Sequence, residues 1–158
     1  TYLPGVARLD YCWCEAHVAR DEMPLAGADI ASLAPHALAR TVLRPHAGAR
    51  WAWFDDAPIA TIWRTNRVSA HAGSDLADIA WRGDGVLITR QAAQVRHVLV
   101  DRATCMFLDA CRAGEAVEQA VVAVLDADPC VNFTKLMTVL IEAGAFAALD
   151  IPKREDKA

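Results

Sequence analysis

The 158-residue sequence has no apolar run approaching the roughly 20 residues that a membrane-spanning helix needs, and no secretory signal pattern. Its five cysteines are an odd number and match no disulfide framework, so we expect reduced thiols and a cytoplasmic protein. Basic side chains are outnumbered, 16 against 20, and the net charge of −4 disfavours sequence-independent attraction to phosphates. A composition of 54% hydrophobic and 23% charged residues is typical of one globular domain or two small subdomains.

Motifs that would indicate an active site are also missing. None of the patterns G-x-S-x-G, G-x-x-x-x-G-K-[ST] and H-E-x-x-H occurs, and the five histidines are scattered. Cys12, Cys14 and His17 resemble a metal cluster, but on a helix the two cysteines diverge, and a closed site needs about four ligands. We therefore predict no catalytic residue and no metal site, and expect packing roles for the thiols of Cys12, Cys14, Cys105, Cys111 and Cys130.

The first part of the chain, residues 1–70, alternates helical and extended patterns. A helix follows Pro4-Gly5, and a short one is expected within 31–40. Two extended runs, 40–45 and 49–54, are separated by the turn sequence PHAG, which predicts a β-hairpin. Asp55-Asp56 with Pro58 indicates the start of a further helix, capped by the aspartates. We predict a helix-and-hairpin platform that ends at the polar, aperiodic segment 69–78.

The second part, residues 79–146, opens with the densest run of strand signals in the chain. It predicts a meander of three strands, joined by a tight Arg-Gly-Asp-Gly turn at 82–85 and a second turn at 91–93. The expected strands are residues 79–81, 86–90 and 95–100.

Three helical patterns follow the meander. Asp101 is expected to cap the first, which Gly114 ends; the second covers 117–125; the third starts at Asp128-Pro129 and ends at Gly144. A last extended segment leads into a tail, assigned to 147–158. The predicted fold class is α+β: an N-terminal helix-and-hairpin subdomain, then a winged-helix-like unit of three strands and three helices.

A sheet followed by three helices is suited to docking either DNA or a peptide. A winged helix would contact DNA through its third helix, but residues 101–144 carry three basic and seven acidic side chains. Phosphates would be repelled by that balance. A sheet edge can instead bind an extended peptide as an added strand. If residues 95–100 form an edge strand, the groove between it and the third helix is the natural slot.

Two stretches, YLPGVARLDYCW (2–13) and TIWRTNR (61–67), resemble the carboxy-terminal half of the HvfC family, and LMTVLIEAGAF (136–146) is similar to that family's ending. The resemblance extends to the MbnC-type proteins of methanobactin biosynthesis. It implies a non-catalytic partner of an MbnB-like multinuclear iron oxidase, which converts cysteines of an MbnA-like precursor peptide to oxazolone and thioamide groups. The iron would belong to the partner enzyme, and this chain would hold the precursor's leader. The amino-terminal helical half of full-length HvfC proteins has no counterpart here: either the chain is MbnC-like and short, or it is truncated. Both branches stay open, and we favour the methanobactin branch over the broader HvfC branch.

These arguments predict a peptide-binding accessory subunit without its own cofactor. The alternatives are an HvfC-type partner for another peptide modification, a DNA-binding regulatory domain, or a copper- or iron-binding protein that uses Cys12, Cys14 and His17. The candidate peptide-binding residues are Arg96, Val98, Val100, Asn132, Lys135 and Leu136. The candidate contacts to the enzyme are Trp51, Trp53, Arg64 and Arg67.

Overall fold

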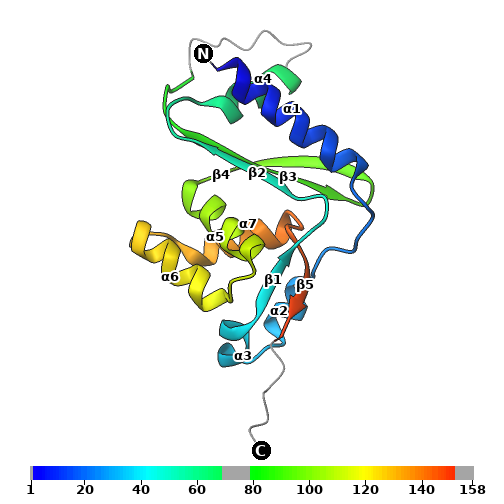
Figure 1. Ribbon diagram of the computed structural model, residues 1–158, viewed down its shortest axis with the longest axis vertical. Helices are drawn as coiled ribbons and strands as arrows, with labels where there is room; N and C mark the ends of the chain where they lie inside the picture. Colours follow the sequence, from blue (N-terminus) through cyan, green and yellow to red (C-terminus); the bar gives the residue numbers. More distant parts are fainter. Residues whose placement is uncertain (1, 69–78, 152–158) are drawn as a thin grey trace, which may run out of the picture.

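The computed structural model describes residues 2–68 and 79–151, where helices combine with two small antiparallel sheets (Figure 1). The larger sheet has the strand order β2–β3–β4, from Arg50–Phe54, Asp84–Gln91 and Gln94–Val100. The smaller sheet pairs β1 (Val42–Pro45) with β5 (Phe146–Asp150). The predicted α+β class is confirmed, and the extended segment expected near the end of the chain is β5.

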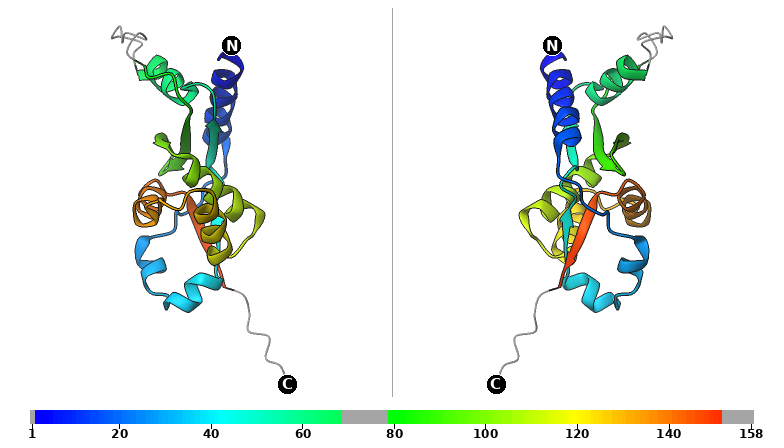
Figure 2. Two further views of the ribbon diagram at one scale, coloured as in Figure 1. Left: turned by 90° about the vertical axis from the view of Figure 1, so that its left-hand side faces the viewer. Right: turned by 90° about the vertical axis from the view of Figure 1, so that its right-hand side faces the viewer.

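The two faces of the larger sheet contact separate cores, because successive side chains along a strand point to opposite sides. Trp51 and Leu87 belong to the core shared with the helices α5 (Arg102–Ala113), α6 (Val117–Ala127) and α7 (Phe133–Glu142). Their neighbours Ala52, Val86 and Ile88 belong to the core shared with α1 (Leu3–Val18) and α4 (Ile59–Val68). Figure 2 shows α1 and α4 on one side of the sheet and α5–α7 on the other.

The helix expected within 31–40 is the shorter α3 (Pro35–Arg40), and a separate short helix, α2 (Gly27–Ala31), precedes it. Pro35 begins α3 because its fixed φ suits the first turn, whereas it lacks the N–H that a continuous helix would need there. Both helices lie beside the β1–β5 ladder (Figure 1).

The predicted hairpin between β1 and β2 is wrong. β1 pairs with β5, more than 100 residues away along the chain, in the register Val42↔Asp150 and Leu43↔Leu149. β2 pairs with β3 from Arg50↔Ile88 to Phe54↔Asp84. A turn sequence brings two strands close but does not choose their partners. Here β2 pairs with β3, which buries Trp51 against α5. β2 also takes the place of the strand expected at 79–81, so the meander is a β3–β4 hairpin to which β2 is added.

The Arg-Gly-Asp-Gly sequence is not a tight turn, since Asp84 and Gly85 already belong to β3. A Cβ on Gly83 would lie 2.6 Å from the carbonyl oxygen of Phe54, so only glycine fits there. The carboxylate of Asp84 accepts hydrogen bonds from the backbone N–H groups of Ala60 (2.9 Å) and Thr61 (2.8 Å). Asp84 therefore caps α4 across the fold, in the role predicted for Asp55-Asp56.

The ends of α5 agree with the prediction. Asp101 accepts a hydrogen bond from Thr104 N (2.8 Å), and Gly114 ends the helix with φ +83°. The predicted start of α7 at Asp128-Pro129 is wrong. The N–H of Asp128 still bonds to Val124 O at the end of α6, so Asn132 caps α7 instead.

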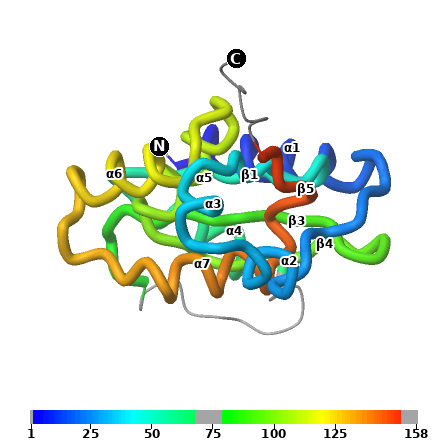
Figure 3. Tube along the Cα trace, turned by 90° about the horizontal axis from the view of Figure 1, so that it is seen from below, coloured from blue at the N-terminus to red at the C-terminus, as the bar shows by residue number. Residues whose placement is uncertain are grey.

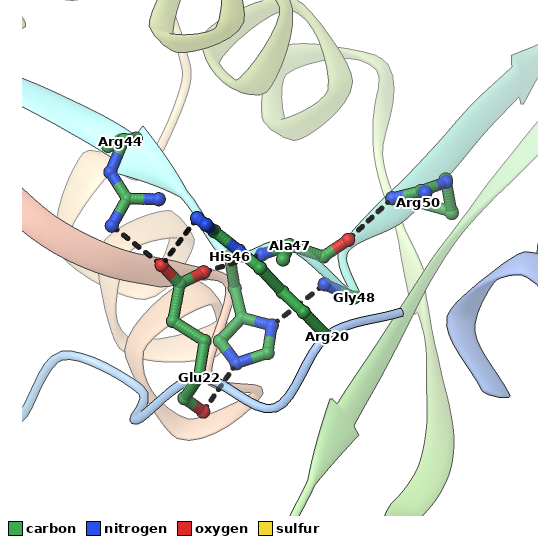
Figure 4. A network of polar contacts seen from close by, with 7 residues as sticks. All are labelled: Arg20, Glu22, Arg44, His46, Ala47, Gly48 and Arg50. Atoms are coloured by element: carbon green, nitrogen blue, oxygen red, sulfur yellow. Dashed lines mark hydrogen bonds and ion pairs between the residues drawn. The ribbon is translucent and has the colours of Figure 1, made fainter. Parts of the chain in front are cut away.

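Glu22, in the segment that follows α1, fastens that segment to the corner between β1 and β2 (Figure 4). Its carboxylate accepts hydrogen bonds from Arg44 (2.7 Å), Arg20 (3.0 Å) and Ala47 N (2.9 Å). The hydrogen bond from Arg44 is the main reason that the pKa of Glu22 falls to about 2. Buried His46 bonds to Glu22 O through Nε2 and accepts from Gly48 N through Nδ1.

Strand pairing joins the two parts of the chain, residues 1–70 and 79–146, that we predicted to be separate subdomains. β2 comes from residues 1–70 but pairs with β3 from residues 79–146, and the boundary at 146/147 falls within β5. The linker itself, 69–78, lies outside the described residues, as does 152–158 of the predicted tail. Within the described ranges, no helix has the length and apolar character required to cross a bilayer.

Candidate functional site: a groove beside an edge strand

The β3–β4 hairpin has a two-residue turn in which Ala92 and Ala93 both have positive φ, 46° and 66°. This geometry defines a type I′ turn, which makes Gln91↔Gln94 a hydrogen-bonded pair. Hydrogen-bonded and non-bonded pairs alternate along an antiparallel ladder. Arg96, Val98 and Val100 therefore bond to β3, whereas the N–H and C=O groups of the intervening β4 residues point away from it.

β4 is an edge strand in the described part of the chain. Its outward-pointing N–H and C=O groups belong to Val95, His97 and Leu99, by the alternation of the register. These three residues turn their side chains to the α1–α4 side, where Val95 and Leu99 join that core. Val98 and Val100 pack on the opposite core, with α7. β4 thus combines an unpaired backbone edge with side chains directed toward α7.

Two adjoining hollows form a groove between β4 and α7. One, of about 240 Å³, is lined by Arg96, Val98 and Glu142, and the other, of about 340 Å³, by Val100, Asn132 and Lys135. Val139, half-buried at the middle of α7, lines both. Figure 3 shows that α7 lies on the β4 side of the sheet and α5 toward the other edge. The groove therefore runs along the edge strand, and we name it the β4–α7 groove.

All six residues predicted to bind peptide line this groove: Arg96, Val98, Val100, Asn132, Lys135 and Leu136. Their contributions differ. Leu136 is only 3% exposed and mainly supports the core, whereas Arg96, Asn132 and Lys135 are exposed. The side chain of Asn132 also accepts a hydrogen bond from Lys135 N (2.9 Å), which fixes the first turn of α7 in the groove wall.

The sequence reasoning missed the backbone donors and acceptors of the edge and the central wall residue Val139. The signal was available in part, because a two-residue turn at 92–93 fixes which β4 residues face outward. The sequence Ala92-Ala93 gives no signal for this turn, because both positions adopt the left-handed conformation that Asn and Gly usually supply.

His97 anchors β4 to the α1–α4 layer. Its ring lies edge-on to Trp63 (5.3 Å between centroids) and Trp13 (6.1 Å). Burial lowers the pKa of His97, and the nearby guanidinium groups of Arg64 and Arg67 lower it further. The neutral imidazole is thus the favoured form, and it holds the strand from the side opposite the groove.

The four predicted enzyme contacts do not share one surface. Trp51 is 8% exposed; its Nε1 donates to Asp109 (3.0 Å), and Arg112 lies 4.6 Å from the centre of its ring. Trp51 therefore serves the core between the sheet and α5 and is not available as a surface anchor. Trp53 and Arg64 do come together, at a hollow of about 670 Å³ near the end of the sheet.

Arg67 has a structural role of its own. Its guanidinium group lies over Trp13 (4.2 Å to the ring centre) and Trp63 (5.0 Å), and it pairs with Asp10 (2.7 Å). Asp10 also accepts a hydrogen bond from Trp63 Nε1 (3.0 Å). These contacts join α1 to α4, so of the four candidates Arg64 and Trp53 are the ones best placed to meet a partner.

The thiols fall into two groups. Burial raises the pKa of Cys105 and of Cys111 to about 12, and Cys12 is half-buried, so the packing role predicted for these three is confirmed. Cys14 and Cys130 are exposed, which contradicts the same prediction for them. Over residues 2–68 and 79–151, no three His, Cys, Asp or Glu side chains gather in a group that could hold a metal ion.

A larger cleft, of about 730 Å³, lies at the far end of the β3–β4 hairpin, between its turn and residues 20–26. Its charged wall residue Arg90 is engaged with Asp21 (2.8 Å) and with His17 O (2.9 Å). The residues that line this cleft present no strand edge to a ligand. The β4–α7 groove is therefore the better candidate for a peptide-binding site, although it is smaller. Comparison with protein-family models, with curated proteins and with solved structures finds no match to this chain.

Proposed function

We propose that this chain is the peptide-binding, non-catalytic subunit of a peptide-modifying iron oxidase, in the manner of HvfC-type and MbnC-type proteins. It holds the leader of a ribosomally made precursor as an added strand on β4, in the β4–α7 groove. The observation that carries the proposal is the outer edge of β4, which pairs with no other strand within residues 2–68 and 79–151 and has a side-chain-lined groove directly beside it. In this proposal the β3–β4 hairpin and α5–α7 act as a winged-helix-like peptide recognition element in a cytoplasmic protein.

The groove has the two kinds of group that strand addition needs. Backbone N–H and C=O groups of Val95, His97 and Leu99 supply hydrogen bonds that any peptide sequence can use. The side chains of Arg96, Val98 and Val100 lie on the groove side and supply selectivity for alternate residues of the peptide. The hairpin is held rigidly from its other face by the Trp13, Trp63 and His97 cluster, so the edge is ready for a strand before the peptide arrives.

The role of such a subunit is to raise effective concentration and fix orientation. A leader held in the groove leaves the rest of the precursor tethered, so that its reactive cysteine meets the enzyme in an intramolecular step. In this proposal the oxidative chemistry and the iron belong to the enzyme, and the enzyme contacts the end of the sheet near Trp53 and Arg64. The expected products are the oxazolone and thioamide groups of a copper-chelating methanobactin, or another modification of the HvfC type.

A DNA-binding regulatory domain is the alternative from a different class. Its recognition helix would be α7, whose only basic side chain is Lys135 and which also carries Glu142. Residues 101–144 as a whole carry seven acidic side chains against three basic ones, a balance that repels phosphates. Charge therefore favours the peptide over DNA as the ligand of this surface.

The proposal is tested by co-expressing this chain with an MbnB-like iron enzyme and its MbnA-like precursor peptide. We expect the chain and the enzyme to purify together, and the mass shift of the precursor to depend on this chain. A modification that proceeds equally without the chain, with no complex formed, contradicts the proposal. An anisotropy titration with duplex DNA completes the test, because salt-sensitive micromolar binding would assign the chain to the DNA-binding class instead.

A further inference from the structure

The outer face of α1 carries an apolar stripe that the proposed function does not use. Leu3, Tyr11 and Val18 are 64%, 66% and 84% exposed, and the exposed small residues Ala7 and Cys14 lie between them. The spacing of four, four, three and four residues places all five on one side of the helix. The opposite side is the buried one, with Leu9 and Ala16 in the core. We name these five residues the α1 seam.

The α1 seam lies far from the peptide site in the layered fold. α1 covers the face of the sheet opposite to α5–α7 (Figures 1 and 2), and none of the residues lining the β4–α7 groove belongs to α1. Exposed tyrosine, leucine and valine side chains aligned along a helix are typical of a contact surface.

The order of large and small side chains along the α1 seam is nearly the same when the helix is read in the opposite direction. Reversal about the middle of the helix brings Leu3 opposite Val18 and Ala7 opposite Cys14, and leaves Tyr11 next to the centre. The larger side chains then meet at the ends, and the small ones meet where two helix backbones approach. A surface that matches its own reverse is what a two-fold symmetric contact requires, because each residue must fit the partner's equivalent patch. We propose that α1 pairs antiparallel with α1 of a second copy of this chain.

The charges beside the seam agree with the antiparallel direction. Arg8 and Glu15 lie on the same flank of the seam, and both reach solvent. In the antiparallel pair, Arg8 of one copy falls within two residues, about 3 Å along the axis, of Glu15 in the other. Two ion pairs related by the two-fold axis result, in which Glu15 keeps its existing partner Arg50. In a two-fold parallel pair, Arg8 and Glu15 of one copy would lie on the flank opposite to those of the other copy, so these ion pairs would not form.

The size of the contact sets the strength of the dimer. A 16-residue helix is about 24 Å long, and one such helix pair buries on the order of 1,000 Å² in total, the low end for specific interfaces. The expected dimer is therefore weak, with a Kd on the order of 10–100 µM. It leaves both β4–α7 grooves open, so each copy retains its peptide site.

Sedimentation equilibrium of the full chain between about 1 µM and 1 mM tests the dimer, and needs no peptide or enzyme. We expect a reversible monomer–dimer equilibrium. Tyr11→Glu is expected to weaken it at least tenfold, while the matched exposed variant Val122→Glu on α6 leaves it unchanged. A chain that stays monomeric up to 1 mM, or a dimer indifferent to Tyr11→Glu, overturns the proposal. Loss of enzyme co-purification by Tyr11→Glu in a monomeric chain would assign the seam to the enzyme.

Disulfide trapping tests the direction, in a background where Cys14 and Cys130 are serine. Leu3→Cys and Val18→Cys proteins are expected to cross-link when mixed and oxidised, and neither is expected to cross-link alone. Cross-linking of Leu3→Cys with itself would indicate a parallel pair and overturn the antiparallel arrangement. Leader binding is measured in parallel by anisotropy, so failure of the dimer and failure of the peptide site are told apart.

Discussion

Replacing Leu99 by proline tests the proposed use of the β4 edge most directly. The N–H of Leu99 points away from β3, so proline at this position removes a donor from the groove and leaves the ladder to β3 complete. The same change at Val98 would instead remove a ladder hydrogen bond and unfold the hairpin. Leu99→Ala is the matched control, because it loses the same side-chain packing on the α1–α4 core but keeps the N–H.

The magnitude follows from the single hydrogen bond that differs between the two variants. A hydrogen bond contributes about 0.5–1.5 kcal/mol, which corresponds to a two- to twelvefold change in Kd, at about 1.4 kcal/mol per factor of ten. The proline ring also occupies the space in which the carbonyl group of the added strand would lie. We therefore expect Leu99→Pro to bind the leader about tenfold more weakly than Leu99→Ala.

The measurement is fluorescence anisotropy with a labelled leader peptide of an MbnA-like precursor. Urea unfolding of both variants provides the check on folding, since both should lose similar stability. If the two variants are equally stable and bind the leader with equal Kd, the peptide does not pair with this edge, and the proposed mode of binding is wrong.

Three further predictions concern the β4–α7 groove, the cap of α4 and the hydrogen bonds of the Glu22 carboxylate. Val139→Trp fills the middle of the β4–α7 groove and should weaken leader binding about tenfold or more. The control Val122→Trp, at an exposed position of α6, should leave leader binding unchanged. If both variants change the Kd of the leader equally, the peptide binds elsewhere. Asp84→Ala removes the cap of α4 and should cost about 1–2 kcal/mol in urea unfolding, against no measurable cost for exposed Asp56→Ala. Glu22→Gln should cost on the order of 1.5–3 kcal/mol at pH 7. Because the fold lowers the pKa of Glu22 from 4.5 to about 2, its contribution is present above pH 4.5 and disappears as the pH falls toward 2. A cost for Glu22→Gln that stayed constant down to pH 2 would contradict this assignment.

The sequence by itself determined the local elements whose signals lie within one or two turns of chain. Asp101 and Gly114 bound α5 because a cap needs only a side chain three residues from its donor and a residue that tolerates positive φ. The α+β class, the β4 strand and the groove-lining residues of β4 and α7 followed from the same local periodicity. All six predicted groove residues line one groove because β4 and α7 have strong period-two and helical patterns.

Only the tertiary structure decided which strands pair and which surfaces remain open. β1 and β2 carry the signals of a hairpin, yet each pairs with a distant strand, because pairing is set by which core buries Leu43 and Trp51. The cap of α4 comes from Asp84, 24 residues away from Ala60, whose N–H donates to it, and the position of Trp51 against α5 removes Trp51 from the surface. The position of β4 at the edge of the sheet, as the described residues show it, is likewise a property of the whole sheet, since an edge strand is one with a pairing partner on one side alone.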